Sequence, residues 1–377
     1  MSRMRLKDIA IEKNERVDNP SQSQYSIFVG LEHYDSGEAT IRRYGSTERL
    51  ESTMKVFHSG DILIARRNVY LKRAATVDFD GLTSGDSIVL HIENEAFRRI
   101  APFVLNTDDF WIYANQHADG SMSKRLSPKL LMEYEFSLPD GNLEQVADIL
   151  WAMERVKTAY RELIARTDDL VKSQFIEMFG TPESALDSSH TIAEVADVQV
   201  GIVIKPTRYY ADGNSGIKAF RSLNIGPMCI KDDDWVCFTE EAMKETQRTI
   251  AHTDDILVVR SGNPGTSCVV PPEYDGCNVI DLIIAHPNKE KVLPEYLSAF
   301  TNMPHGMNQI NSQQRGVAQK HFNVGMYKDL KLILPSLDEQ KRFVEFLKQS
   351  DKSKFAAQQA LKEVADAQKA LMKKIFE

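Results

Sequence analysis

The chain has 377 residues, of which 42% are hydrophobic and 27% charged, and its formal net charge is −8. This length exceeds what one compact core needs and indicates two domains, while the composition is typical of soluble globular proteins. No apolar run reaches the roughly 18 residues of a membrane span, and the charged N-terminal stretch lacks the apolar core of a secretory signal, so we expect a cytoplasmic protein.

The predicted elements divide the chain into four segments. Residues 1–142 hold short β-rich runs, such as SIFVG and DILIA, separated by turn-forming Gly, Asp, Asn and Pro. From residue 143 to 182, apolar residues recur at helical spacing and predict one long helix. Residues 183–336 return to β-rich runs such as DDILVV, and residues 337–377 repeat the helical pattern. We therefore expect an α+β fold, with two mixed, strand-rich domains joined by two long helices.

The two halves of the sequence resemble each other in four places that occur in the same order. The matched pairs are LKDIA (6–10) with IAEVA (192–196), FVGLEHY (28–34) with FRSLNIG (220–226), GDILIARR (60–67) with DDILVVRS (254–261), and EFSLPD (135–140) with LILPSL (332–337). The third match aligns Asp61 with Asp255. Each match is short, but their common order with slowly drifting offsets indicates an internal repeat.

Each long helix carries one apolar stripe that suits a partner helix. The stripe residues are Leu143, Val146, Leu150, Met153, Tyr160, Ile164, Val171 and Met178 in the first helix, and Val344, Leu347, Leu361, Met372 and Ile375 in the second. A helix from Leu143 to Phe179 would extend about 55 Å, which is longer than a domain of this size needs for its own core. We therefore expect the two helices to pair as an antiparallel coiled coil with a pseudo-twofold axis.

Positive charge is concentrated in two stretches although the chain is acidic overall. Between Ile41 and Arg73 there are eight basic residues and three acidic ones, and a weaker basic stretch runs from Gly201 to Arg221. A single basic residue more often solvates an exposed face than binds a ligand, but clustering indicates contact with nucleic-acid phosphates.

Together these features resemble the specificity (S) subunits of type I restriction-modification systems. The segments that carry the resemblance are FVGLEHYDSGEATIRRYG (28–45), SGDILIARR (59–67), TSGDSIVL (83–90), QFIEMFG (174–180), DDILVVRSGNPGTS (254–267) and LPSLDEQKRFVEFL (334–347). The resemblance covers the whole chain. The start of the first helix departs from the family pattern, because Glu144 and Gln145 replace its fuller form, and the repeats diverge elsewhere.

The resemblance implies a non-catalytic subunit whose two domains each read one half of a split, asymmetric DNA target, while the helices set the spacer. It implies double-stranded DNA and two methyltransferase (M) subunits as partners, with restriction/translocase (R) subunits as optional ones. S-adenosylmethionine is expected in the M subunits, and no cofactor or metal in this chain. The residues predicted to contact bases or phosphates are Arg42, Arg43, Arg66, Arg67, Lys72, Arg73, Lys124, Arg125, Lys205, Arg208, Arg221, Arg260, Asn263 and Arg315.

The sequence carries no catalytic signature of its own. VVPPEYDG (269–276) has valine where an adenine methyltransferase needs Asn or Asp, and RSGNPGTS (260–267) lacks the lysine of a phosphate-binding loop. The four cysteines form no C-x-x-C pair, which predicts reduced structural thiols. Two alternatives stay open: a coiled-coil assembly adaptor that does not read DNA, and a stand-alone DNA-binding regulator, which the acidic charge disfavours.

Overall fold

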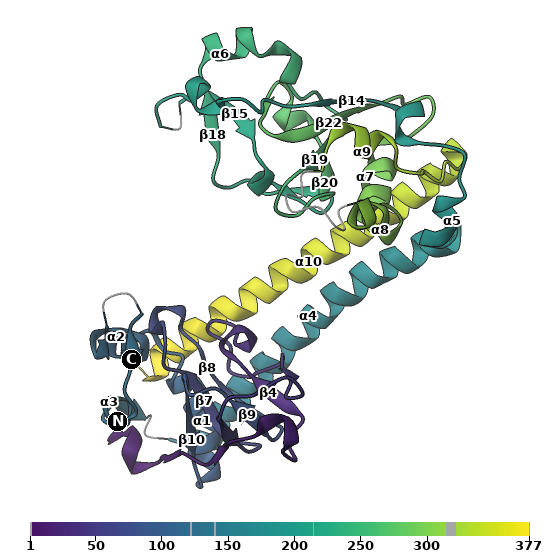
Figure 1. Ribbon diagram of the computed structural model, residues 1–377. Coiled ribbons are helices and arrows are strands. Elements are labelled where there is room, and N and C mark those ends of the chain that lie inside the picture. The colour runs from purple at the N-terminus through teal and green to yellow at the C-terminus, as the bar shows by residue number, and fades with distance from the viewer. Residues whose placement is uncertain (1, 121–122, 139–140, 214, 314–321, 377) are drawn as a thin grey trace. The chain divides into compact units, whose positions relative to one another are not determined.

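The computed structural model in Figure 1 describes residues 2–120, 123–138, 141–213, 215–313 and 322–376. The chain divides into unit 1 (Met1–Leu163 and Ala356–Glu377) and unit 2 (Ile164–Phe355). Two long helices, α4 (Leu143–Phe179) and α10 (Leu337–Phe376), each contribute a segment to both units. Among the described helices, none combines the length and apolarity needed to cross a bilayer.

A four-stranded antiparallel sheet forms the centre of unit 1. Its order is β2 (Ile11–Lys13), β10 (Ser87–His91), β7 (Ile62–Ala65) and β8 (Ala74–Thr76). Every residue of β7 is buried, because Ile62 and Ile64 pack against helices while Leu63 and Ala65 pack into a second core on the other face. A strand that is covered on both faces reads as a continuous apolar run, which is why DILIA lacks polar alternation.

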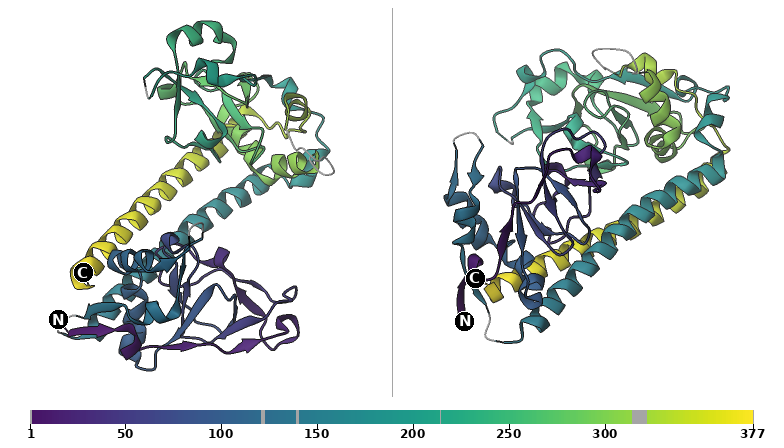
Figure 2. Two further views of the ribbon diagram at one scale, coloured as in Figure 1. Left: turned by 60° about the vertical axis from the view of Figure 1, so that its left-hand side comes forward. Right: turned by 60° about the horizontal axis from the view of Figure 1, so that its bottom comes forward.

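Three short helices and a second sheet complete unit 1. The helices are α1 (Glu95–Val104), α2 (Asp108–Gln116) and α3 (Pro128–Met132). The second sheet has the order β3 (Arg16–Val17), β6 (Met54–Phe57), β9 (Gly81–Thr83), β4 (Ile27–Val29) and β5 (Gly45–Ser46). The short pairs are β1 (Ser2–Arg5) with β13 (Glu135–Leu138), and β11 (Ala118–Asp119) with β12 (Arg125–Leu126). Arg3 and Phe376 line one hollow, so the two ends of the chain lie near one another (Figure 2).

Unit 2 repeats the central sheet of unit 1 strand for strand. Its antiparallel order is β14 (Ala196–Val200), β22 (Leu282–Pro287), β19 (Ile256–Val259) and β20 (Ser267–Val269). The remaining strands are β15 (Ile217–Phe220), β16 (Ile225–Gly226), β17 (Cys229–Ile230), β18 (Val236–Phe238) and β21 (Asn278–Val279). The short helices are α5 (Pro182–Leu186), α6 (Glu240–Glu245), α7 (Pro294–Asn302), α8 (Pro304–Gln313) and α9 (Val324–Lys328). The shared strand order confirms the internal repeat.

The aligned aspartates Asp61 and Asp255 make the same contacts in both units. Asp61 accepts a hydrogen bond from the His58 backbone N–H at 2.9 Å, and its other oxygen lies 2.8 Å from Nδ1 of His91. Asp255 accepts from the His252 N–H at 2.7 Å and lies 2.6 Å from Nδ1 of His286. Both carboxylates are buried. Each one therefore fixes the turn that leads into the central strand, β7 or β19.

The hydrogen bond to Asp255 makes the stability of unit 2 depend on pH. It raises the pKa of His286 above its usual value, although burial opposes the shift. The stabilisation is therefore complete below the unfolded pKa of about 6.5 and is lost as the pH rises through the higher folded pKa. We expect the melting temperature to fall between pH 6 and pH 8, and to fall less in His286→Gln. His190→Gln, which removes an exposed histidine paired with Glu194, is the control that should keep the wild-type pH dependence.

The ends of both long helices follow from local sequence. Asn142 accepts hydrogen bonds from the backbone N–H groups of Glu144 and Gln145, which caps the start of α4. The helix ends at Phe179 because Gly180 adopts a left-handed conformation (φ 91°), which favours glycine. α10 starts with a reciprocal pair in which Ser336 and Glu339 cap each other's backbone N–H. The domain boundaries at residues 142, 182 and 336 remain predictions.

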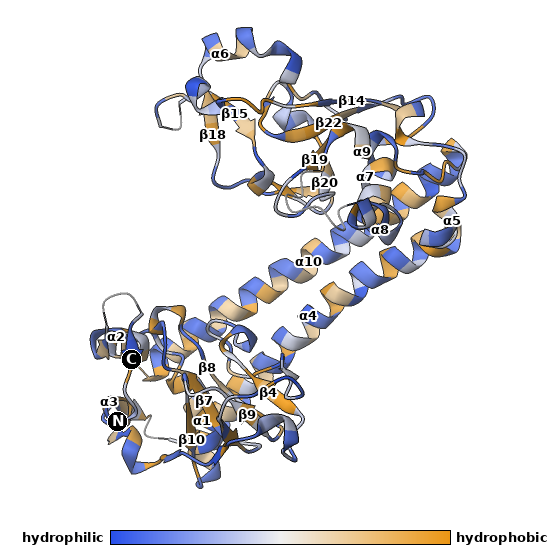
Figure 3. Cartoon of the chain, in the orientation of Figure 1, coloured by the Kyte–Doolittle hydropathy of each residue, from blue (hydrophilic) through white to orange (hydrophobic). Residues whose placement is uncertain are grey.

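Within each unit the segments of α4 and α10 pack antiparallel. In unit 1, Leu150 near the start of α4 shares a core with Met372 and Phe376 near the end of α10. In unit 2, Phe175 near the end of α4 packs edge-on against Phe343 near the start of α10, with ring centroids 5.0 Å apart. All thirteen predicted stripe residues are buried or half-buried, and Figure 3 shows apolar and polar residues alternating along both helices. The predicted fold class, with its helical coiled coil, is confirmed.

Candidate nucleic-acid interface

Basic residues from two distant parts of the sequence meet beside the central sheet of unit 1. Arg66 and Arg67 follow directly after β7, and Lys124 and Arg125 precede α3. The two segments are joined by backbone hydrogen bonds from Leu126 N–H to the Arg66 carbonyl (2.9 Å) and from Asn68 N–H to the Lys124 carbonyl (2.8 Å). We refer to the following residues as the basic cluster: Arg66, Arg67, Arg73, Lys124 and Arg125.

One carboxylate organises the basic cluster. Asp86 lies 3.6 Å from Nη1 of Arg67 and 3.3 Å from Nη2 of Arg125. The Nε of Arg67 also donates to the Ser123 hydroxyl at 2.8 Å. These arginine side chains remain 44% and 52% exposed, so both guanidinium groups are oriented yet accessible. Because Asp86 neutralises only one of several cations, the cluster keeps excess positive charge.

Arg73 shapes the loop that carries the basic cluster. Its guanidinium donates to the backbone carbonyls of Leu31 (3.0 Å) and Arg67 (2.9 Å), and burial lowers its pKa although a guanidinium stays charged. The adjoining turn contains Asn68 and Lys72 in left-handed conformations and leaves the Tyr70 ring exposed. Arg73 therefore positions the loop, whereas Lys124 is exposed and its amine has no partner among the described residues.

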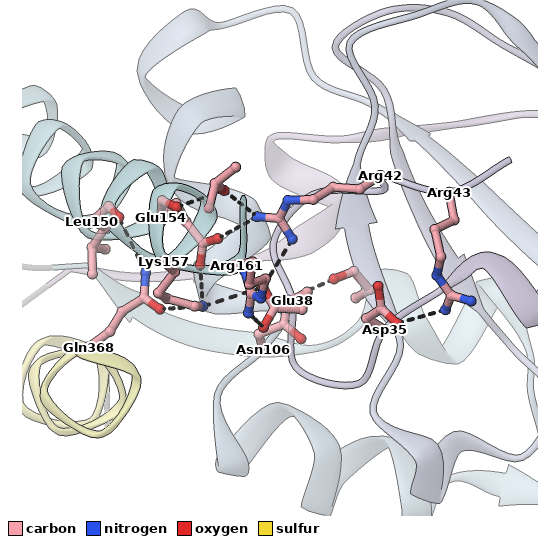
Figure 4. A network of polar contacts seen from close by, with 12 residues as sticks. Asp35, Glu38, Arg42, Arg43, Asn106, Leu150, Glu154, Lys157, Arg161 and Gln368 are labelled. Atoms are coloured by element: carbon pink, nitrogen blue, oxygen red, sulfur yellow. Dashed lines mark hydrogen bonds and ion pairs between the residues drawn. The ribbon is translucent and has the colours of Figure 1, made fainter. Parts of the chain in front are cut away.

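Three other predicted contact residues of unit 1 lie outside the basic cluster. Arg42 points to α4 (Figure 4), and Arg43 pairs with Asp35 at 2.6 Å. Lys72 pairs with Asp108 at 2.7 Å, and Lys369 contacts the same carboxylate at 3.0 Å. The structure does not bring these cations together, and their role in DNA contact stays a prediction.

Unit 2 places Arg260 where unit 1 has Arg66. Arg260 follows directly after β19, and its carbonyl accepts from the Phe322 N–H at 3.1 Å, as the Arg66 carbonyl accepts from Leu126. Its side chain pairs with Asp281 at 2.5 Å and donates to the Phe322 carbonyl at 3.1 Å. Asn263 is exposed on the next turn. Arg315 lies outside the described residues.

The other predicted residues of unit 2 form separate groups. Arg221 pairs with Asp234 at 3.2 Å. Lys205 is exposed on a left-handed turn, and the guanidinium of Arg208 lies over the Tyr209 ring, 4.4 Å from its centroid. The structure also adds Lys218, whose amine lies over the Trp235 ring at 4.7 Å and pairs with Asp232.

Asp86 and Asp281 were missed as organising residues at the sequence level. Both stand just before the strand that pairs with the central strand of their sheet, Asp86 before β10 and Asp281 before β22. Both bind an arginine that follows this central strand. The signal was present, because NVIDLIIAH holds an aspartate directly before an apolar run, and TSGDSIVL holds one that only Ser87 separates from such a run.

Comparison with known protein families gives a match in the second half of the chain. Residues 216–366 match the family model described as type I restriction modification DNA specificity domain. This region is similar to a type I specificity domain. The matched region contains β15 to β22 and most of α10, and therefore three of the four strands of the central sheet of unit 2, whose order unit 1 repeats. The resemblance to specificity subunits that the sequence indicated is confirmed.

Solved structures show the same fold over nearly the whole chain. The type I restriction-modification S subunit from M. genitalium has 12% sequence identity and a TM-score of 0.56, with 100% of this chain and 96% of that chain covered. A second structure comes from work on the complex assembly and conformational transition of the type I R-M system. It has 19% sequence identity and a TM-score of 0.51, with 99% of this chain and 97% of that chain covered. None of the curated proteins matches the chain significantly.

Proposed function

We propose that the chain is the DNA-specificity subunit of a type I restriction-modification complex, in which each unit reads one half of a split, asymmetric target. The observation that carries this proposal is the repeated placement of arginine directly after the central strand, at Arg66 and Arg67 in unit 1 and at Arg260 in unit 2. In both units an aspartate forms an ion pair with an arginine at this place. In both units, too, the carbonyl of the first arginine accepts a hydrogen bond from a backbone N–H distant in sequence.

The exposed guanidinium groups of the basic cluster suit direct reading of bases. A guanidinium can donate two parallel hydrogen bonds to O6 and N7 of guanine in the major groove. Arg67 and Arg125 are pre-oriented by Asp86 and still accessible, which lowers the ordering cost of such contacts. The amine of Lys124 is a point charge, which is better suited to a phosphate.

Methylation is assigned to partner subunits. S-adenosylmethionine and the reacting groups are expected in two M subunits, and R subunits are optional partners of the same complex. This chain then supplies only DNA contacts and positioning. The net charge of −8 fits a reader that shares phosphate neutralisation with its partners rather than binding DNA alone.

An apolar groove on the helices of unit 1 is the proposed docking surface for an M subunit. Ile149 and Val156 stand one heptad apart on α4, are 48% and 42% exposed, and lie beside the stripe that faces α10. With Ala152, Met153, Val364 and Ala367 they line a groove of about 440 Å³, which we call the α4 groove. Large apolar side chains exposed at heptad spacing fit the apolar face of a further helix.

Long-read mapping of methylated adenines tests the proposed function. DNA from cells that express this chain with its methyltransferase partner is compared with DNA from cells that express the methyltransferase alone. We expect a split, asymmetric motif that requires this chain, and exchange of residues 1–142 for another such domain should change one half only. A soluble, assembled complex without new methylation would favour the assembly adaptor instead.

A further inference from the structure

A loop of unit 1 is bound to α4 through charged side chains (Figure 4). Glu38, in the loop after β4, forms ion pairs with Arg42 at 3.2 Å and with Lys157 of α4 at 3.5 Å, and it also accepts from Arg161. Glu154 of α4 receives Arg42 at 3.2 Å and Lys157 at 2.7 Å. We call these five residues the Glu38 network.

The network extends to α10 through an amide. Nζ of Lys157 donates to Oε1 of Gln368 at 2.9 Å, and Nε2 of Gln368 donates to the Leu150 carbonyl at 3.2 Å. Both residues interrupt the apolar stripes of their helices. A buried polar pair inside an apolar seam penalises every other alignment of two helices, because a shift would leave each polar group unpaired. One network therefore fixes the helix register and also holds the domain loop.

The Glu38 network is buried, so its geometry is restrictive. The side chains of Glu154 and Lys157 are each 4% exposed, and that of Glu38 is 15% exposed. Burial alone would raise the pKa of Glu38, but Lys157, Arg161 and Arg42 together lower it, so the carboxylate is charged. Loss of one partner would leave the remaining charges buried and uncompensated, and the loop or the helix would have to shift to expose them to water.

The described part of unit 2 shows no counterpart of Glu38, although its helices carry a related charged contact. The aligned loop, Pro227–Ile230, has no acidic residue. It faces α4 across a hollow of about 380 Å³, whose lining includes Cys229 and an ion pair of 2.5 Å between Asp168 of α4 and Lys354 of α10. Because this contact joins the two helices in unit 2 without an acidic loop residue, helix pairing alone does not explain why the loop of unit 1 supplies Glu38.

We propose that the Glu38 network is a positioning device, in which Glu38 and Arg42 set the orientation of the unit 1 domain on the helices and thereby the half-site spacing that the complex accepts. This assignment rests on the proposed function. It gives Arg42 a role through α4 rather than at DNA bases. The residues act by holding the reading surface, and the basic cluster makes the contacts.

Spacer selectivity tests the proposal. The assembled complex is offered DNA in which both half-sites are fixed and the spacer is the preferred length, one base pair shorter or one longer. Misplacement of a rigid site by about 1 Å can lower its effectiveness by up to roughly 100-fold. We therefore expect Glu38→Gln to lower, by about tenfold, the ratio between the affinity for DNA with the preferred spacer and the affinity for DNA with the other spacers. The half-site sequences should stay the same. Arg161→Gln, which removes a more exposed partner, should act in the same direction but less.

Asp148→Asn is the matched control. Asp148 also joins the domain to α4, through an ion pair of 2.5 Å with Arg99, but its side chain is 66% exposed. It should therefore leave spacer selectivity unchanged. If Glu38→Gln and Arg161→Gln fold and keep the wild-type spacer preference, the proposal is overturned, and it is equally overturned if Asp148→Asn has the same effect as Glu38→Gln.

A measurement without DNA separates this proposal from the proposed function. Spin labels are attached at Arg49→Cys and Arg155→Cys, both exposed positions, in a Cys229→Ser background because Cys229 is the exposed native thiol. A narrow distance distribution that broadens in Glu38→Gln but not in Asp148→Asn supports positioning even if the wild-type complex reads no split target. An unchanged distribution in Glu38→Gln counts against it whatever the DNA result.

Discussion

Replacing Arg67 and Arg125 together with alanine is expected to lower the affinity of the assembled complex for its target by roughly 100-fold, because each bidentate arginine–guanine contact contributes about 1–3 kcal/mol. The variant should fold normally, since both side chains are about half exposed, and Asp86, their carboxylate partner in the described part of the chain, is itself 26% exposed. The measurement is a gel-shift titration at one fixed salt concentration, because phosphate contacts make DNA affinity strongly salt-dependent.

Selection from a random-sequence library locates the lost contacts. The Arg67→Ala/Arg125→Ala variant should relax sequence preference in one half-site and retain it in the other, since both residues belong to unit 1. Arg49→Ala, an exposed arginine of unit 1 outside the basic cluster, is the control and should keep full preference. Relaxation of both half-sites, or of neither, would show that unit 1 does not read its half through this cluster.

The long helices could be predicted from sequence because their determinants are local. The apolar stripe recurs within each helical turn, and the capping Asn142 and the terminating Gly180 directly flank the ends of α4. The internal repeat could also be predicted, because Asp61 and Asp255 stand at matching sequence positions, and both are buried and make the same turn-fixing hydrogen bonds. Strand order was not readable, since β7 pairs with β10 and β8 through contacts distant in sequence.

The candidate site was only partly predictable, because tertiary packing decides which charges meet. Arg42 stands in the basic stretch and looks like a DNA contact, but its partner Glu154 lies on α4, more than a hundred residues away. Conversely, Arg67 and Arg125 meet although no sequence pattern connects them. Divergence between the repeats hides further correspondence. Strand β18 pairs with β15 as β5 pairs with β4, but α6 follows β18 in unit 2, whereas residues 47–53, which follow β5 in unit 1, form no helix.

Substitution of Val156 by glutamate is expected to abolish assembly with the methyltransferase partner and therefore all methylation that depends on this chain. A carboxylate placed in the α4 groove must lose its water when a helix docks there, and no cation of the groove can pair with it, since the lining residues are apolar apart from Glu363. The free chain should melt as the wild type does, because Val156 is exposed in it. Size-exclusion chromatography of the mixed subunits measures assembly directly.

Arg155→Glu distinguishes the α4 groove from the helix as a whole. It adds negative charge at the neighbouring exposed position of α4, outside the groove, and should leave assembly intact. If Val156→Glu assembles normally, the M subunit docks elsewhere on this chain; if Arg155→Glu fails equally, charge along α4 rather than the apolar groove governs docking. Assembly lost only in Val156→Glu, with the fold of the free chain preserved, would separate the docking surface proposed on α4 from the DNA-reading role proposed for the basic cluster.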